Sequence, residues 1–123
     1  MMIERRTRRS DRPSEALALQ LQSCAERAGL QAVIVSDYDG FLVGASPWSR
    51  EDSEELAALL PLLARDGRFA GILLGEASIG WAVQVETFKS EDERLFICAV
   101  GKIGPGVADE ISTAVAGVSR ILH

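Results

Sequence analysis

The sequence predicts an α+β fold, with a five-stranded antiparallel sheet, helices on both faces and the element order α-β-β-α-β-β-β-α. Three stretches place apolar residues at helical spacing, whereas five shorter stretches are rich in β-branched residues or alternate apolar with polar residues. The links between successive strands are short, which favours antiparallel hairpins. Packing in layers then places the helices on the faces of the sheet.

Size and composition limit the classes of protein to which the chain can belong. With 123 residues, of which 47% are hydrophobic, it has room for one core and is not a largely disordered chain. No apolar run approaches the roughly 18 residues that span a bilayer, and no apolar segment follows the basic N-terminus as in a signal peptide. Cys24 and Cys98 stand alone, without metal-ligand spacing. We therefore expect a cytoplasmic protein with reduced cysteines and no membrane span.

The charge of the chain is unevenly placed. Five arginines against Glu4 and Asp11 give residues 1–12 a net charge of +3, so residues 13–123 must carry −8 to give the total of −5. Because binding to phosphates along nucleic acid needs a basic face, the acidic body argues against nucleic-acid binding. We expect residues 1–12 to be a disordered basic arm and residues 13–123 to form the domain. Contact of the arm with an anionic partner or membrane is the alternative.

The first and last helices each show one apolar stripe. A helix over 13–28 has Asp11 as its cap and Gly29 as its stop, and a second helix covers 107–122. Because each has a single stripe, both are expected on the same face of the sheet, with the middle helix on the other. The stripes are Leu17, Leu21, Cys24, Ala25 and Ala28 in the first and Val107, Ile111, Ala114, Val115, Val118, Ile121 and Leu122 in the last.

A hairpin follows the first helix. The apolar run 32–36 and the returning run 41–45 flank an Asp-Gly pair, which is typical of a tight turn because Gly40 adopts positive φ at little cost. Asp37 and Asp39 flank its tip and could be imagined as an acid pair. Aspartate is favoured at such positions by turn hydrogen bonds, so we interpret both as turn residues.

The middle helix has more apolar surface than one face of a sheet needs. It is expected to begin near Ser49, with acidic residues in its first turn, and Pro61 is expected to bend or shorten it. A helix that is apolar beyond one face tends to be covered on a second side, here more plausibly by another subunit. One face holds Leu56, Leu60 and Leu63, and Leu59 and Leu62 lie to its side.

Three more strands are expected, over 71–75, 81–87 and 95–100. The second alternates apolar with polar residues. The third is apolar on both faces, which suits a central strand covered above and below. The polar run 89–94 is expected to be the loop between the second and third strands.

No catalytic constellation emerges from the sequence. The only histidine, His123, is the last residue, which removes His-dependent triads and His metal sites. Residues 101–106 lack the Ser or Thr that follows Gly-Lys in a phosphate loop. We predict no catalytic residue, no cofactor and no metal. Trp48 and Arg50 are of types enriched at interface hot spots, although packing of Trp48 on its own helix is an equal alternative.

The element order, together with particular residues, resembles the roadblock/dynein light chain family. The resemblance covers roughly residues 13–122. It rests on 29–36 and 39–43 around the hairpin, on the acidic start and residues 56–60 of the middle helix, and on 104–106 before the last helix. It implies a profilin-like fold and a non-catalytic dimer. In such a dimer the strands after the middle helices pair into one ten-stranded sheet, with the middle helices side by side.

The resemblance also implies a partner. Bacterial relatives often act with Ras-like small GTPases, including as activating partners in polarity and gliding motility, and others serve as motor or signalling scaffolds. The expected function is therefore a non-catalytic homodimeric adaptor that binds and regulates a Ras-like small GTPase. The alternative is a small-ligand-sensing or motor and signalling scaffold module of the same fold; a ligand sensor predicts a closed apolar pocket. The expected dimer residues are Leu59, Leu60, Leu62, Leu63, Ile72, Leu73 and Leu74, and the candidate partner contacts are Trp48, Arg50, Glu54 and Glu55.

Overall fold

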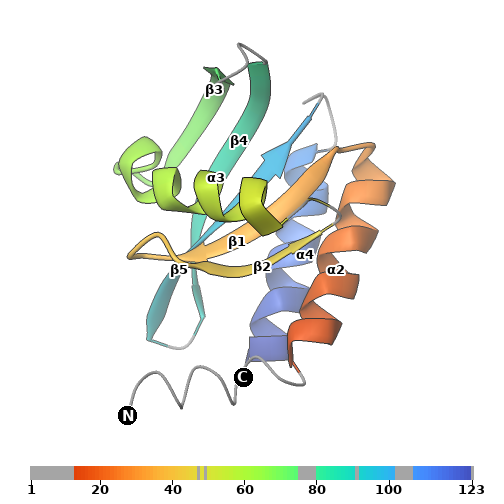
Figure 1. Cartoon of the computed structure of the whole chain (residues 1–123). Helices are drawn as coiled ribbons and strands as arrows, with labels where there is room; N and C mark the ends of the chain where they lie inside the picture. The colour runs from red at the N-terminus through yellow and green to blue at the C-terminus, as the bar shows by residue number, and fades with distance from the viewer. Residues whose placement is uncertain are drawn as a thin grey trace.

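The chain folds around one antiparallel sheet. A computed structural model describes residues 13–46, 48, 50–74, 80–90, 92–101 and 107–122. Its elements are α2 (Pro13–Ala28), β1 (Ala32–Asp37), β2 (Leu42–Ser46), α3 (Arg50–Leu63), β3 (Arg68–Leu74), β4 (Gly80–Ser90), β5 (Glu93–Val100) and α4 (Val107–Leu122). This order, with its five-stranded sheet, confirms the predicted fold class (Figure 1). The basic arm at 1–12 and the Gly-Pro-Gly turn at 104–106 lie outside the described residues.

β5 occupies the centre of the sheet, although it is the last of the described strands in chain order. The strand order is β2-β1-β5-β4-β3, and every neighbouring pair is antiparallel. β5 pairs with β1 from Ala32↔Val100 to Asp37↔Leu95. Its side chains alternate between two buried clusters, which confirms the prediction of a central strand covered above and below. β2 and β3 are left at the two edges.

The helices form two layers. α2 and α4 pack together on one face of the sheet, and α3 lies across the other (Figure 1), as the apolar stripes predict. α2 lies close to β2 at Gly44, where an added Cβ would lie 2.8 Å from Cγ of Leu17. The buried cluster beneath α3, called here the α3-side core, consists of Ala32, Ile34, Leu56, Ala57, Leu60, Ala64, Val83, Val85, Phe96, Cys98 and Val100.

The tip of the β1–β2 hairpin is held by Asp37 and rests on α3. Oδ1 of Asp37 accepts hydrogen bonds from the backbone N–H groups of Asp39 at 3.0 Å and Phe41 at 2.9 Å. Gly40 has φ 89°, and a Cβ there would lie 3.2 Å from Cα of Ala58 in α3. Only glycine fits both the positive φ and the close approach. The interpretation of both aspartates as turn residues is thereby confirmed.

The turn after α3 is shorter than the sequence predicts. α3 continues for two residues beyond Pro61 and ends at Leu63, so the proline does not stop the helix where it stands. Gly67 then has φ 106°, and β3 begins at Arg68 rather than at residue 71. The earlier start adds Phe69 to the strand.

The β4–β5 hairpin is longer than predicted. The stretch 89–94, expected to be a loop, continues the ladder, in which Lys89 pairs with Arg94 and Ser90 with Glu93. The prediction of a loop was wrong because it was based on the lack of apolar side chains in this stretch. The hydrogen bonds of an antiparallel ladder join backbone groups, so polar residues can continue it. As a result, two basic residues stand directly opposite each other.

Candidate functional site

α3 buries one side against the sheet and presents the other to solvent. The two sides follow the helical period, as residues three and four apart share a face. The exposed side is acidic in its first half, where carboxylates complement the helix dipole, and apolar in its second half. The buried residues are Ser53, Leu56, Ala57 and Leu60, and the exposed side consists of Glu51, Glu54, Glu55, Ala58, Leu59 and Leu62.

The leucines predicted to meet a second subunit separate into two groups. Leu59 is 38% exposed and Leu62 is 69% exposed, so both are open to a contact. Leu60 is 0% exposed, because it lies one turn after Leu56 on the side that faces the sheet. This corrects the prediction for Leu60, whose side chain is part of the α3-side core and absent from the surface. Leu63 is half-buried against the same core.

β3 forms the edge of the sheet on this side of the molecule. It pairs only with β4 among the described strands, from Arg68↔Glu86 to Leu74↔Gly80. Ile72, in the middle of the expected pairing strand, is 71% exposed. Leu73 and Leu74 also belong to β3, but the side chain of Leu73 and that of Leu74 lie outside the described residues. β3 therefore offers a row of backbone donors and acceptors with an exposed apolar side chain.

Ile72 and the exposed leucines of α3 lie on opposite faces of the sheet. Phe69 packs against the α3-side core, and a Cβ at Gly71 would lie 2.9 Å from Cζ of its ring, so these two residues share the α3 face. Because side chains alternate along a strand, Ile72 points to the face of α2 and α4. A contact that covers both Leu62 and Ile72 must therefore reach around the edge of β3.

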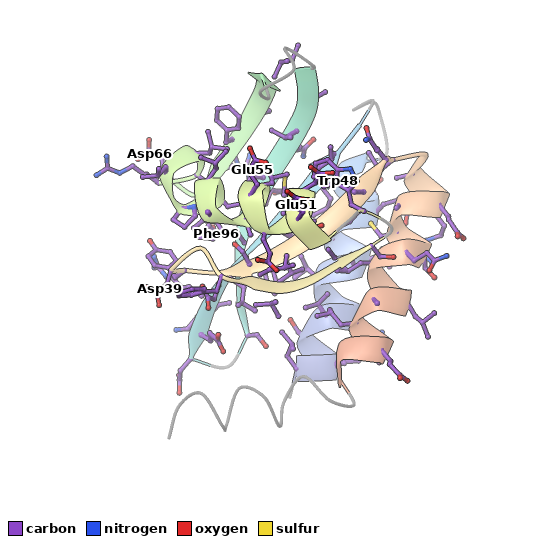
Figure 2. The ribbon with its side chains drawn as sticks, in the orientation of Figure 1. Asp39, Trp48, Glu51, Glu55, Asp66 and Phe96 are labelled. Carbon is purple, nitrogen blue, oxygen red and sulfur yellow. The ribbon has the colours of Figure 1, made fainter. Side chains whose placement is uncertain are left out.

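The predicted partner contacts lie at the first half of α3. Figure 2 shows Trp48 and Glu51 toward one end of this helix, with Asp66 beyond its other end. Trp48 is half-buried and packs against the α3-side core. Arg50 is the first residue of α3, but its side chain lies outside the described residues. Glu54 and Glu55 are exposed.

The two cysteines are structural. Burial raises the pKa of the Cys98 thiol to about 12. The pKa of Cys24 is also raised, first by burial and then by the nearby Glu110 carboxylate. Thiols with raised pKa values are poor nucleophiles at neutral pH. Within the part of the chain that the structure describes, no three His, Cys, Asp or Glu side chains gather to hold a metal ion, and no helix is long and apolar enough to cross a membrane.

Comparison with solved structures identifies the fold. No protein-family profile and no curated protein matches the sequence. The structure is similar to Myxococcus xanthus MglB, with a TM-score of 0.58 and 14% identity over 87% of both chains. It is similar to the gliding protein MglB from Thermus thermophilus, with a TM-score of 0.60 and 16% identity over 89% of this chain and 90% of that one. A Roadblock/LC7 domain from Streptomyces avermitilis gives a TM-score of 0.60 and 12% identity over 85% of this chain and 96% of that one.

The chain has the Roadblock/LC7 fold. The likeness lies in the arrangement of the elements, since at most one residue in six is identical in these pairs. Phe69, which joins the edge strand to the α3-side core, was not among the residues predicted from the sequence. The signal that could have found it is the apolar run from Phe69 to Leu74, which begins two residues before the predicted start of the strand at residue 71.

Proposed function

We propose that the chain is a non-catalytic homodimeric adaptor that binds and regulates a Ras-like small GTPase in the cytoplasm. The observation that carries this proposal is the division of the exposed side of α3 into an acidic half and an apolar half. The apolar half is suited to a second copy, and the acidic half remains available to another protein. The shared fold with MglB proteins, one of them named a gliding protein, supports the same assignment.

The dimer would form around the β3 edge. Two β3 edges related by a two-fold axis pair antiparallel, which satisfies their backbone groups and joins two five-stranded sheets into one of ten strands. α3 is linked to β3 by a short turn, so the pairing also brings the apolar halves of the two α3 helices toward each other. Burial of Leu59, Leu62 and Ile72 then supplies the hydrophobic part of the association.

The GTPase would meet the acidic halves of the two helices. Each copy presents Glu51, Glu54 and Glu55 on one exposed side, so a dimer doubles this negative surface. Complementary charge steers encounter and orients the partner. Trp48 and Arg50 stand at the start of the same helix. Regulation requires that these contacts differ between the GDP and GTP forms of the switch loops, because a partner shifts an equilibrium only through differential affinity.

The test is a binding titration with purified small GTPases from the same genome, loaded with GDP or with a GTP analogue. We expect one nucleotide form to bind more tightly, and Glu55→Lys to weaken that binding. Glu26→Lys is the matched control, since Glu26 is an exposed glutamate of α2 on the other face. Binding that does not depend on the nucleotide, or an equal loss in both variants, would refute the proposal.

A further inference from the structure

A pocket lies at the end of the molecule away from the acidic half of α3. Its volume is about 440 Å³, within the range of sites that hold small ligands. Three chain segments meet there: the β1–β2 turn at Tyr38, the turn after α3 at 64–67, and the paired ends of β4 and β5. Figure 2 shows Asp39 of the hairpin tip and Asp66 of the turn at this end, with Trp48 toward the other. Basic and aromatic side chains line the pocket together, unlike the closed apolar pocket that a hydrophobic ligand needs.

The pocket is basic on an acidic body. Arg65, Lys89 and Arg94 line it, and Asp66 is the acidic residue among its lining residues, so the lining carries a net charge of +2. None of the three basic residues forms an ion pair with another described residue. Their charges are therefore free to act together on a ligand.

The strand register forces two of these charges together. Lys89 of β4 is the direct cross-strand partner of Arg94 of β5. Arg94 lies two residues before Phe96, a member of the α3-side core, so both cations are on the α3 face. Like charges directly opposite in an antiparallel pair destabilise the ladder. An anion bound between them would remove that repulsion.

Arg94 is held in place by an aromatic stack. The rings of Tyr38 and buried Phe96 are parallel within 9°, with centroids 5.3 Å apart. Cζ of Arg94 lies 5.8 Å from the centroid of the Tyr38 ring, a cation–π distance. On the facing wall, the hydroxyl of Thr87 donates to the carbonyl of Gly67 at 3.1 Å and fixes the turn that carries Arg65. The cations thus project from ordered parts of the fold, which lowers the entropy lost when a ligand binds.

We propose that this pocket binds the phosphate group of a ligand. A phosphate monoester carries about −1.5 to −2 charges at neutral pH, which matches the net +2 of the lining, whereas a single carboxylate neutralises half of it. Arginine is the residue best suited to recognise phosphate oxygens in pairs. The phosphate can belong to a free nucleotide or metabolite, or to a phosphorylated side chain of a partner. The site uses none of the residues assigned above to the dimer or to the GTPase, so its test does not depend on the proposed function.

Inorganic phosphate is the first probe, titrated into the full chain by calorimetry at about 150 mM salt. We expect saturable binding that Lys89→Gln and Arg94→Gln each weaken roughly tenfold or more, as for loss of a charge-assisted hydrogen bond. Arg120→Gln, which removes an exposed charge from α4, is the matched control and should leave the affinity unchanged. A phosphoserine peptide and its unphosphorylated form identify the source, since preference for the phosphopeptide indicates a partner and preference for inorganic phosphate a free ligand.

Thermal unfolding separates binding from a structural role. Without ligand, Lys89→Gln should melt at or above the temperature of the unsubstituted chain, because it relieves the repulsion with Arg94. Inorganic phosphate should raise the melting temperature of the unsubstituted chain by more than that of Lys89→Gln at the same concentration. The proposal is overturned if no saturable binding occurs, or if Arg120→Gln weakens binding as much as Lys89→Gln does. It is also overturned if a peptide with glutamate in place of the phosphoserine binds more tightly than the phosphoserine peptide.

Discussion

Replacement of Leu62 by glutamate tests the proposed dimer at the most exposed leucine of α3. Leu62 is 69% exposed in the protomer and makes little contribution to the protomer's own core. Full burial of a leucine is worth roughly 1.5–3 kcal/mol, so covering the exposed part contributes about 1–2 kcal/mol per copy and about 2–4 kcal/mol per two-fold dimer. Leu62→Glu should therefore raise the dimer dissociation constant roughly 30- to 700-fold, before the repulsion of two new carboxylates is added.

Leu19 provides a matched control for this experiment. It is 66% exposed and also lies on a helix, but α2 covers the opposite face of the sheet from α3. Sedimentation across a concentration series should show Leu62→Glu dissociating at concentrations where Leu19→Glu and the unsubstituted chain remain dimeric. Circular dichroism should show all three folded. The reasoning fails if the two variants shift dissociation equally, or if the unsubstituted chain is a monomer at high micromolar concentration.

Three further predictions concern the stability of the protomer. Gly40→Ala should cost roughly 1–3 kcal/mol in urea unfolding, because it places a Cβ at positive φ and 3.2 Å from Cα of Ala58; an unchanged midpoint would contradict this. Asp37→Ala should cost roughly 1–3 kcal/mol because two turn N–H groups lose their acceptor, while Asp37→Asn keeps an oxygen there and should cost less; equal losses would remove the hydrogen bonds as the cause. Burial raises the pKa of Cys98 to about 12, so unfolding favours loss of the thiol proton above the ordinary pKa of 9.0. The free energy of unfolding should be insensitive to this group below about pH 8 and fall by up to about 1.4 kcal/mol per pH unit as pH rises from about 9 to 12. Cys98→Ala should remove this contribution and make the fall less steep, and an unchanged slope would contradict the reasoning.

Local patterns in the sequence were enough to predict the elements and their layers. The stripes of the first and last helices, the Asp-Gly hairpin and the two-sided β5 each depend on neighbours along the chain. Leu60 shows that the helical period was a better guide than the family resemblance. A rotation of about 100° per residue groups Leu60 with Leu56 on one face and places Leu59 to its side, and these are the buried and exposed residues. The prediction of Leu60 as a dimer contact came from the resemblance, which does not say how α3 is oriented on the sheet.

The phosphate pocket could not be predicted from the sequence. Tyr38, Arg65 and Lys89 belong to three turns or strand ends that are far apart in the chain. They meet because β5 enters the sheet between β1 and β4, an order that short hairpin connections do not specify. The pairing of Lys89 with Arg94 was hidden for a second reason, since a run of polar residues was taken to be a loop.

The central position of β5 governs how the chain can fold. β1 finds its partner about sixty residues later, and both hydrophobic clusters contain β5 side chains. Such distant pairing is slow to nucleate, since the intervening segment loses its freedom before the contact is gained. During synthesis neither cluster can close until β5, at Glu93–Val100, has emerged from the ribosome. A truncation before residue 93 should leave β1 without a neighbour on one side and the product prone to aggregate.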